Sequence, residues 1–312
     1  MSPQHRPPLP PILVISIGIL AVSTASILIR LAQEDAPSIV IAAYRLTLAS
    51  IVLSPVAWLR HRTELRALTR RDVLLGFLSG VFLAIHFATW ITSLEFTSVA
   101  SSVVIVTTTP LWVAILSPLV LQEPIGRSVV IGLILSLTGG ITVGLNESCT
   151  LTGTQFTCPG LATLFQTSSA IGNTLALFGA FSAAGYILIG RSLRTKLSLI
   201  PYIFVVYGIA AILLIVTMIG FGNSPVGYSP ITYLWFLLLA LVPQLLGHSS
   251  FNWALGYLPA SFVSITLLGE PVGTIILAYI ILYESPAPLE LIGAILILAG
   301  IYIASQKPKR HI

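Results

Sequence analysis

The sequence of 312 residues predicts an all-α integral membrane protein in which ten transmembrane helices form two inverted repeats of five. Three observations lead to this fold class: the composition is apolar, ten segments have the length of a membrane span, and the two halves of the chain repeat each other. Hydrophobic residues make up 56% of the chain and charged residues 8%, whereas a soluble domain carries about a quarter charged residues. The composition therefore excludes soluble enzymes, nucleic-acid-binding proteins and disordered chains.

Ten apolar segments are long enough to cross a bilayer, because a helix needs about 20 apolar residues to do so. None shows the ten-residue alternation of a membrane β-barrel strand. We expect no cleavable signal before Pro11, since the first apolar run can itself span the membrane. The predicted spans are 11–31, 38–58, 73–93, 98–121, 125–144, 172–190, 199–221, 231–251, 261–282 and 290–306.

The placement of charge predicts the orientation, because Lys and Arg collect in cytoplasmic connections. All basic residues except Arg30 and Arg45 fall in the two termini or in connections on the same side of the membrane. The opposite connections carry no Lys or Arg but several acidic residues: Glu34, Asp35, Glu95, Glu147, Glu284 and Glu290. We therefore expect a multi-pass protein of an inner or plasma membrane with both termini in the cytoplasm.

The longest outer connection, 145–171, contains two cysteines in the stretch CTLTGTQFTC. Cys149 and Cys158 share one exported loop, so they can form a disulfide bond there. The alternative is a pair of free thiols.

The chain repeats itself without a gap when segment 94–143 is aligned with segment 255–304. Each repeat contains an odd number of spans, so the second copy enters the membrane from the opposite side. We divide the chain into a first five-helix repeat over 11–144, the linker loop and a second five-helix repeat over 172–306. Inverted repeats are typical of secondary transporters, which bind substrate near the membrane midplane. The matching positions include Pro110/Pro271, Leu121/Leu282, Glu123/Glu284, Gly132/Gly293 and Gly139/Gly300.

The same blocks resemble a known family. SLEFTSVASSVV followed by LVLQEP, the related ALGYLPASFVS in the second half, AAYRL at 42–46 and LVPQLLGHSSFNWAL at 241–255 carry the resemblance. Over 11–306 the chain is similar to ten-helix permeases of the EamA type in the drug/metabolite transporter superfamily. This resemblance implies helices around a central cavity and alternating access without ATP. It also implies export of amino acids, related metabolites or organic cations.

Two proline-broken spans indicate where the substrate binds. Pro271 lacks an N–H group and leaves the carbonyl of Leu267 without its helical donor, and Pro110 does the same to Val106 beside Thr109. Paired interruptions in corresponding helices are typical of a transporter site. The alternative is a pair of packing kinks.

Polar residues inside other spans are further candidates, since such residues tend to face a bundle interior. Gln244, His248 and Asn252 are four residues apart and are predicted to share one helix face, which Trp253 flanks. His86 and Trp90 are one turn apart. Histidine and tryptophan suit a cavity for a zwitterion or a cation. The alternatives are interhelical hydrogen bonds for the polar groups and an interface anchor for Trp90. No spacing fits a zinc site, and we expect no metal and no cofactor.

Arg45 and Glu270 are the charged candidates. Arg45 lies about one third of the way into its span, where three roles stay open: binding a substrate carboxylate, neutralising Glu270, or extending outward to the interface. Glu270 is the only carboxylate near the middle of a span. A carboxyl group that gains and loses a proton at this depth can couple transport to a proton gradient.

Together these features predict a secondary active transporter that exports a small metabolite, with an amino acid or a related amphipathic compound as the first candidate. The partners are then a small-molecule substrate and the lipid bilayer. No P-loop motif for nucleotide hydrolysis is present in the sequence. The alternatives are an exporter or exchanger of organic cations or other drugs and, in a different class, a membrane-embedded enzyme, although common catalytic motifs are missing from the sequence.

Overall fold

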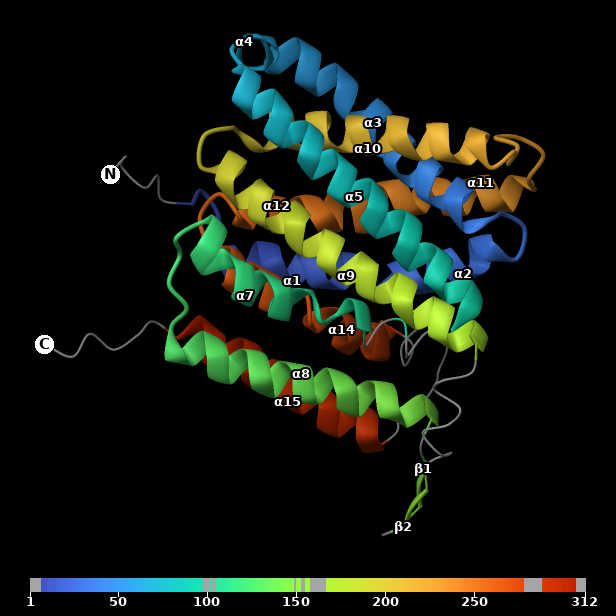
Figure 1. Ribbon diagram of the computed structural model, residues 1–312, viewed down its shortest axis with the longest axis vertical. Helices are drawn as coiled ribbons and strands as arrows, with labels where there is room; N and C mark the ends of the chain where they lie inside the picture. Colours follow the sequence, from blue (N-terminus) through green and yellow to red (C-terminus); the bar gives the residue numbers. More distant parts are fainter. Residues whose placement is uncertain are drawn as a thin grey trace, which may run out of the picture.

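The computed structural model describes residues 7–97, 102, 105–148, 150–152, 155–157, 167–277 and 288–306. It is a bundle of helices whose axes run broadly along one direction (Figure 1). The all-α prediction is confirmed for this bundle. The linker loop additionally contains a hairpin of two short strands that was not predicted, β1 (Thr150–Thr152) and β2 (Gln155–Thr157). Cys149 and Cys158 lie outside the described residues, so their pairing stays a prediction.

The helices follow the predicted apolar segments closely. The first half contains α1 (Pro11–Val22), α2 (Ala25–Gln33), α3 (Ser38–Arg60), α4 (Arg62–Arg66), α5 (Arg70–Phe96), α7 (Thr109–Val120) and α8 (Arg127–Ser148). The second half contains α9 (Thr167–Arg194), α10 (Leu199–Gly220), α11 (Pro230–Leu239), the π-helix η2 (Ala240–His248), α12 (Ser249–Ala254), α13 (Ala260–Thr266), α14 (Gly269–Leu277) and α15 (Pro288–Ser305).

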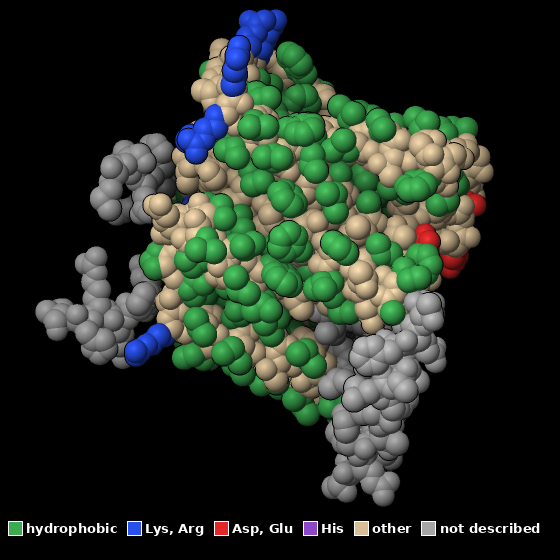
Figure 2. All heavy atoms as spheres, in the orientation of Figure 1, with side chains coloured by type: hydrophobic (Ala, Val, Ile, Leu, Met, Phe, Trp, Pro, Cys, Tyr) green, Lys and Arg blue, Asp and Glu red, His purple; other side chains and the backbone are tan. Residues whose placement is uncertain are grey.

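Within the described residues, six helical segments are long and apolar enough to cross a membrane: Pro11–Gln33, Ser38–Arg60, Arg70–Phe96, Ala170–Arg194, Leu199–Gly220 and Pro230–Ala254. Shorter apolar helices accompany them at Thr109–Val120, Arg127–Thr142 and Leu291–Ser305. Large hydrophobic side chains are spread over the face of the bundle shown in Figure 2, where a water-soluble protein would place polar groups. These features are those of a multi-pass membrane protein.

Charge separates along the bundle. Figure 2 shows Lys and Arg side chains at one end and acidic side chains at the other. The exposed arginines of the first end flank α4 and begin α8, and they include Arg66 and Arg127. At the opposite end, the connection between α2 and α3 exposes Glu34 and Asp35, and the end of α5 exposes Glu95. We call these the basic end and the acidic end.

The first predicted span is not one continuous helix, because a break at Ser23 and Thr24 separates α1 from α2. Both hydroxyl groups donate to nearby backbone carbonyls, Ser23 to Ile19 (2.7 Å) and Thr24 to Ala21 (2.8 Å), which offers the backbone an alternative to the regular helix. The Ser23 hydroxyl also lies 2.9 Å from the carbonyl oxygen of Glu270 at the start of α14. The break in the first span therefore packs against the break before α14.

The predicted span over 231–251 is also irregular, since its central part is the π-helix η2. Pro243 lies inside it and cannot donate a hydrogen bond to the preceding turn, as a regular α-helix requires. Wider π turns inside helices are frequent at functional sites. The regular four-residue spacing assumed for Gln244 and His248 therefore does not hold in this helix.

Helices α8 and α15 run antiparallel along one edge of the bundle (Figure 1). Their backbones touch at glycines, with Gly132 against Gly300 and Gly139 against Gly293. A Cβ atom on Gly139 would lie 2.6 Å from the carbonyl oxygen of Gly293, a distance that no side chain can occupy. The small residues thus permit the close approach of the two helices.

The other long helices also form close pairs. α5 packs along α9, α3 packs along α10, and α1 packs against η2 and α12. Their apolar faces form one large core that includes Phe87, Tyr207 and Phe236, while α8 and α15 contribute to a separate cluster around Leu133 and Ile297.

Replacing Gly139 with Ala should force α8 and α15 apart, because the new methyl group meets backbone atoms of Gly293 and Ile297. We expect a loss of stability of about 1–3 kcal/mol, the usual cost of overpacking. Thermal unfolding of the purified protein in detergent measures it. Gly208→Ala is the control, since a Cβ at Gly208 meets no atom within 4 Å. An equal effect of both substitutions would contradict the glycine contact.

Candidate functional site

A cavity of about 70 Å³ lies inside the bundle, where the three helix breaks meet. Val22 and Ala25 line it from the first break, Thr107 and Pro110 from the start of α7, and the backbone around Leu267 from the break before α14. A volume of this size has room for a few water molecules. A metabolite therefore requires the surrounding helices to move apart.

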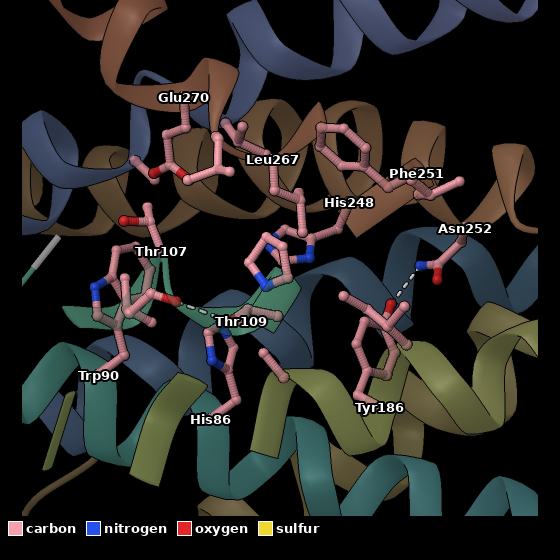
Figure 3. A pocket seen from close by; sticks show the side chains of 18 of the residues that line it. His86, Trp90, Thr107, Thr109, Tyr186, His248, Phe251, Asn252, Leu267 and Glu270 are labelled. Atoms are coloured by element: carbon pink, nitrogen blue, oxygen red, sulfur yellow. Dashed lines mark hydrogen bonds between the residues drawn. The ribbon is translucent and has the colours of Figure 1, made fainter. Parts of the chain in front are cut away.

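Most of the predicted site residues line this cavity, and several of them surround it in Figure 3. They come from six different elements, so residues distant in sequence converge on one space. The lining residues among those predicted are Arg45, His86, Trp90, Thr109, Pro110, His248, Asn252 and Glu270.

Three predicted residues lie outside the lining. Gln244 is fully buried behind it and contacts Arg45 instead. Trp253 is partly buried and packs against Tyr257, with ring centroids 4.7 Å apart. One residue beyond Asn252 turns the side chain by about 100° around the helix, and a role of Trp253 in substrate binding stays a prediction. Pro271 is buried directly after Glu270.

The side chain of Arg45 has no exposed surface, so it does not extend to the interface. Its Nε donates a hydrogen bond to Oε1 of Gln244 at 2.8 Å. The guanidinium carbon lies 4.2 Å from the centroid of the Phe87 ring, which is a cation–π arrangement. Both terminal nitrogens of the guanidinium are buried and have no hydrogen-bond partner among the residues that the structure describes.

His86 and Trp90 present their rings to the cavity from α5. The rings stack with an interplanar angle of 11° and centroids 5.8 Å apart. The Nδ1 of His86 lies 3.0 Å from the carbonyl oxygen of Gly179 and must donate to it, because a carbonyl can only accept. The indole Nε1 of Trp90 is buried without a partner. His248 reaches the cavity from η2, in edge contact with the ring of Phe87.

Asn252 is held by two tyrosines. Its side-chain amide donates to the hydroxyl groups of Tyr186, as Figure 3 shows, and of Tyr207 at 3.1 Å. Sequence reasoning missed Tyr186, Thr107 and Phe251, which also line the cavity. The phenol of Tyr186 within an apolar span was the available signal, whereas nothing in the sequence distinguishes Phe251 from a core side chain.

Both proline breaks have their backbone groups satisfied locally. The carbonyl of Val106, which Pro110 deprives of a donor, accepts the hydroxyl of Thr109 at 2.8 Å. The carbonyl of Leu267 accepts the backbone N–H of Glu270 at 3.0 Å. Neither carbonyl therefore depends on a substrate for a hydrogen-bond donor in this conformation.

Glu270 carries the carboxyl group of the cavity. Its backbone carbonyl accepts hydrogen bonds from Ser23 and Thr274 at the break. The carboxyl group itself forms no ion pair or hydrogen bond with the described residues, and no ion pair joins it to Arg45.

An ion pair closes the bundle next to the cavity, on the basic end. Nε of Arg191 lies 2.7 Å from Oε1 of Glu123, and its Nη1 donates to the carbonyl of Leu255, a cavity-lining residue, at 2.8 Å. Oε2 of Glu123 accepts the backbone N–H of Ala260. This bridge joins the end of α9, the connection before α8 and the connection between α12 and α13.

Replacing Thr109 with Val should destabilise the protein by about 1–3 kcal/mol, because it leaves the partly buried carbonyl of Val106 without its side-chain donor. The hydroxyl also lies 3.2 Å from the carbonyl of Ala180 on α9. Thermal unfolding measures the change. Thr138→Val is the matched control, since that hydroxyl is exposed on α8 and bonds only within its own helix. A Thr109 variant as stable as this control would disprove the role of the hydroxyl.

Comparison with known proteins agrees with this fold. The uncharacterized transporter YdfC of Bacillus subtilis is 25% identical over 264 residues, 84% of this chain and 79% of the relative. An uncharacterized transporter of Archaeoglobus fulgidus is 24% identical over 299 residues, 95% of this chain and 97% of the relative. A crystal structure with 17% sequence identity superposes with a TM-score of 0.73 over 94% of this chain and 95% of its own, which shows a shared fold.

The family comparison is more specific. The model of the EamA-like transporter family matches the chain twice, over residues 9–145 and 170–306. These two matches cover most of the sequence, and the protein belongs to the EamA-like transporter family.

Proposed function

We propose that the protein is a secondary active transporter of an inner or plasma membrane, which exports a small amphipathic metabolite by alternating access without ATP. The substrate is an amino acid or a related compound. The observation that carries this proposal is the cavity at the meeting point of three helix breaks, because transporters place their sites at interrupted helices. Its lining combines aromatic and aliphatic side chains with one guanidinium and one carboxyl group, as an amphipathic substrate requires.

The proposed architecture is ten spans in two inverted repeats, 11–144 and 172–306, joined by the loop 145–171. The glycine contacts support it: Gly132 corresponds in the repeat to Gly293, and Gly139 to Gly300. The observed contacts join Gly132 to Gly300 and Gly139 to Gly293. Two halves related by a two-fold axis exchange partners in this way.

A second pair of contacts supports the same symmetry. Nε2 of Gln33 donates to the carbonyl of Ile91 at 3.1 Å, and Nε of Arg194 donates to the carbonyl of Asn252 at 2.9 Å. In the proposed repeat, Gln33 corresponds to Arg194 and Ile91 to Asn252. The polar contacts of the two halves thus match although the side chains differ.

The charge separation supports the proposed orientation, with the basic end and both termini in the cytoplasm. The bridge between Arg191 and Glu123 then closes the cytoplasmic side of the cavity. Loading of a substrate for export requires this bridge to part. The small volume of the cavity supports the interpretation that this conformation lies between the inward-open and outward-open states of the cycle.

Counterflow in proteoliposomes tests the transport proposal. Vesicles are loaded with neutral, aromatic and acidic amino acids, and the entry of each labelled compound is followed beside that of an organic cation. We expect saturable exchange of at least one amino acid, reduced about tenfold or more in the His248→Ala and Asn252→Ala variants, which lose polar groups of the cavity. Thr138→Val, on the lipid side of α8, should leave exchange unchanged. Exchange of the organic cation alone would refute the amino-acid assignment.

Replacing Glu270 with Gln tests proton coupling. The carboxyl group of Glu270 lines the cavity and forms no ion pair with the described residues, so it is available to carry a proton across. We expect the Gln variant to lose flux driven by an imposed pH gradient and to retain substrate exchange. Glu95→Gln, at the exposed acidic end, is the control and should keep driven flux. Coupling through Glu270 is wrong if its Gln variant still responds to the gradient.

A further inference from the structure

Within the described part of the chain, buried N–H donors without a hydrogen-bond partner occur on Arg45, on the neighbouring Gln244 and on Trp90. They are the two terminal nitrogens of the Arg45 guanidinium, Nε2 of Gln244 and Nε1 of Trp90. Arg45 and Trp90 line the cavity, and Gln244 holds Arg45 through its amide oxygen. Apart from the Trp112 indole, these are all the buried unpartnered side-chain nitrogens of the described part of the chain.

The positive charge of Arg45 is fixed in place. An arginine side chain stays protonated in proteins, and this one has no exposed surface. The contacts of the guanidinium with Gln244 and Phe87 set its orientation, but neither contact neutralises it. A buried charge is costly unless an opposite charge and hydrogen bonds satisfy it directly, so the arrangement favours an anion that reaches the two terminal nitrogens.

Among the described residues, no carboxylate lies within ion-pair distance of Arg45, and Glu270 attracts the guanidinium only from farther away. Glu270 lines the same cavity but forms no ion pair with Arg45. The other titratable side chains of the lining are His86, His248 and Tyr186, none of which is an anion at neutral pH. The two terminal nitrogens of Arg45 thus have no direct partner among the described residues and are left for a ligand.

We propose that Arg45 anchors the carboxylate of the transported substrate and that this carboxylate is the required recognition element. The inference rests on the proposed transport function and narrows it to amphipathic carboxylates, to the exclusion of organic cations. Two parallel N–H donors match the two oxygens of a carboxylate. Phe251, Val263 and Leu267 surround the remaining volume with apolar surface, which suits an apolar substrate body.

A carboxylate fits better than a phosphate for a reason of charge. One guanidinium balances one negative charge, and the described lining offers no second arginine or lysine side chain for a further negative charge on the ligand. A phosphate ester carries more charge and recruits several basic side chains, but the cavity lining holds the single arginine.

Thermal unfolding of the purified full-length protein tests the anchor without requiring transport. The probes are L-leucine and L-phenylalanine, their amides, which lack the carboxylate, phenylpyruvate, which lacks the amine, and inorganic phosphate. We expect at least one of the acids to raise the melting temperature while its amide and phosphate do not. A shift with phenylpyruvate as well would show that the amine is dispensable.

Variants assign the effect to Arg45. Arg45→Met should weaken acid binding about a hundredfold. Arg45→Lys keeps the charge but lacks the two parallel N–H donors, so it should weaken acid binding about tenfold. If Arg45→Met does not fold, Gln244→Leu serves instead, because it keeps the guanidinium but removes the acceptor that orients it. That variant should bind acids more weakly while still preferring them to amides.

The proposal is overturned if amides stabilise the protein as well as the acids, if Arg45→Met binds acids like the unmodified protein, or if no acid shifts the melting temperature. Its failure differs from that of the transport function. Acids that bind through Arg45 but never exchange in vesicles would refute transport and leave the anchor standing. Saturable exchange that requires neither a substrate carboxylate nor Arg45 would refute the anchor and leave the transport function standing.

Discussion

The site depends on one constraint of the membrane interior: every backbone carbonyl there must find a hydrogen-bond donor inside the protein. Helices can break only where such donors are at hand. The Thr109 hydroxyl serves the carbonyl of Val106, and the Glu270 amide serves that of Leu267. The single proton of the Ser23 hydroxyl is shared between the carbonyls of Ile19 and Glu270. Each break is therefore paired with local polar groups, and the cavity opens where the breaks meet.

The cavity joins features that would each be unfavourable in a plain helical bundle. The π-helix places Gln244 against Arg45 and His248 at the cavity surface. The tyrosines of α9 and α10 hold Asn252 by its amide. Such polar groups lower the stability of a lipid-embedded core unless they are satisfied, and the extensive apolar packing around Phe87 offsets that loss.

The helical segments were predictable because apolar runs of spanning length are a strong signal, and polar residues within them pointed to the cavity. The burial of Arg45 was not predictable, because an arginine one third of the way into a span can also extend its side chain to the membrane interface. The break at Ser23 was missed because serine and threonine are common inside membrane helices. Regular helical spacing misplaced Gln244, since the π turn around Pro243 widens the helix there.

The glycine contacts between α8 and α15 have a mechanical consequence. Ser136 donates to the carbonyl of Ile297 at 3.3 Å, and these two positions correspond to each other in the proposed repeat. A residue that touches its own counterpart lies on the two-fold axis. If the two halves exchange conformations during a cycle, points on that axis keep their neighbours. The contact between α8 and α15 then stays fixed, and the helices around the cavity rotate relative to it.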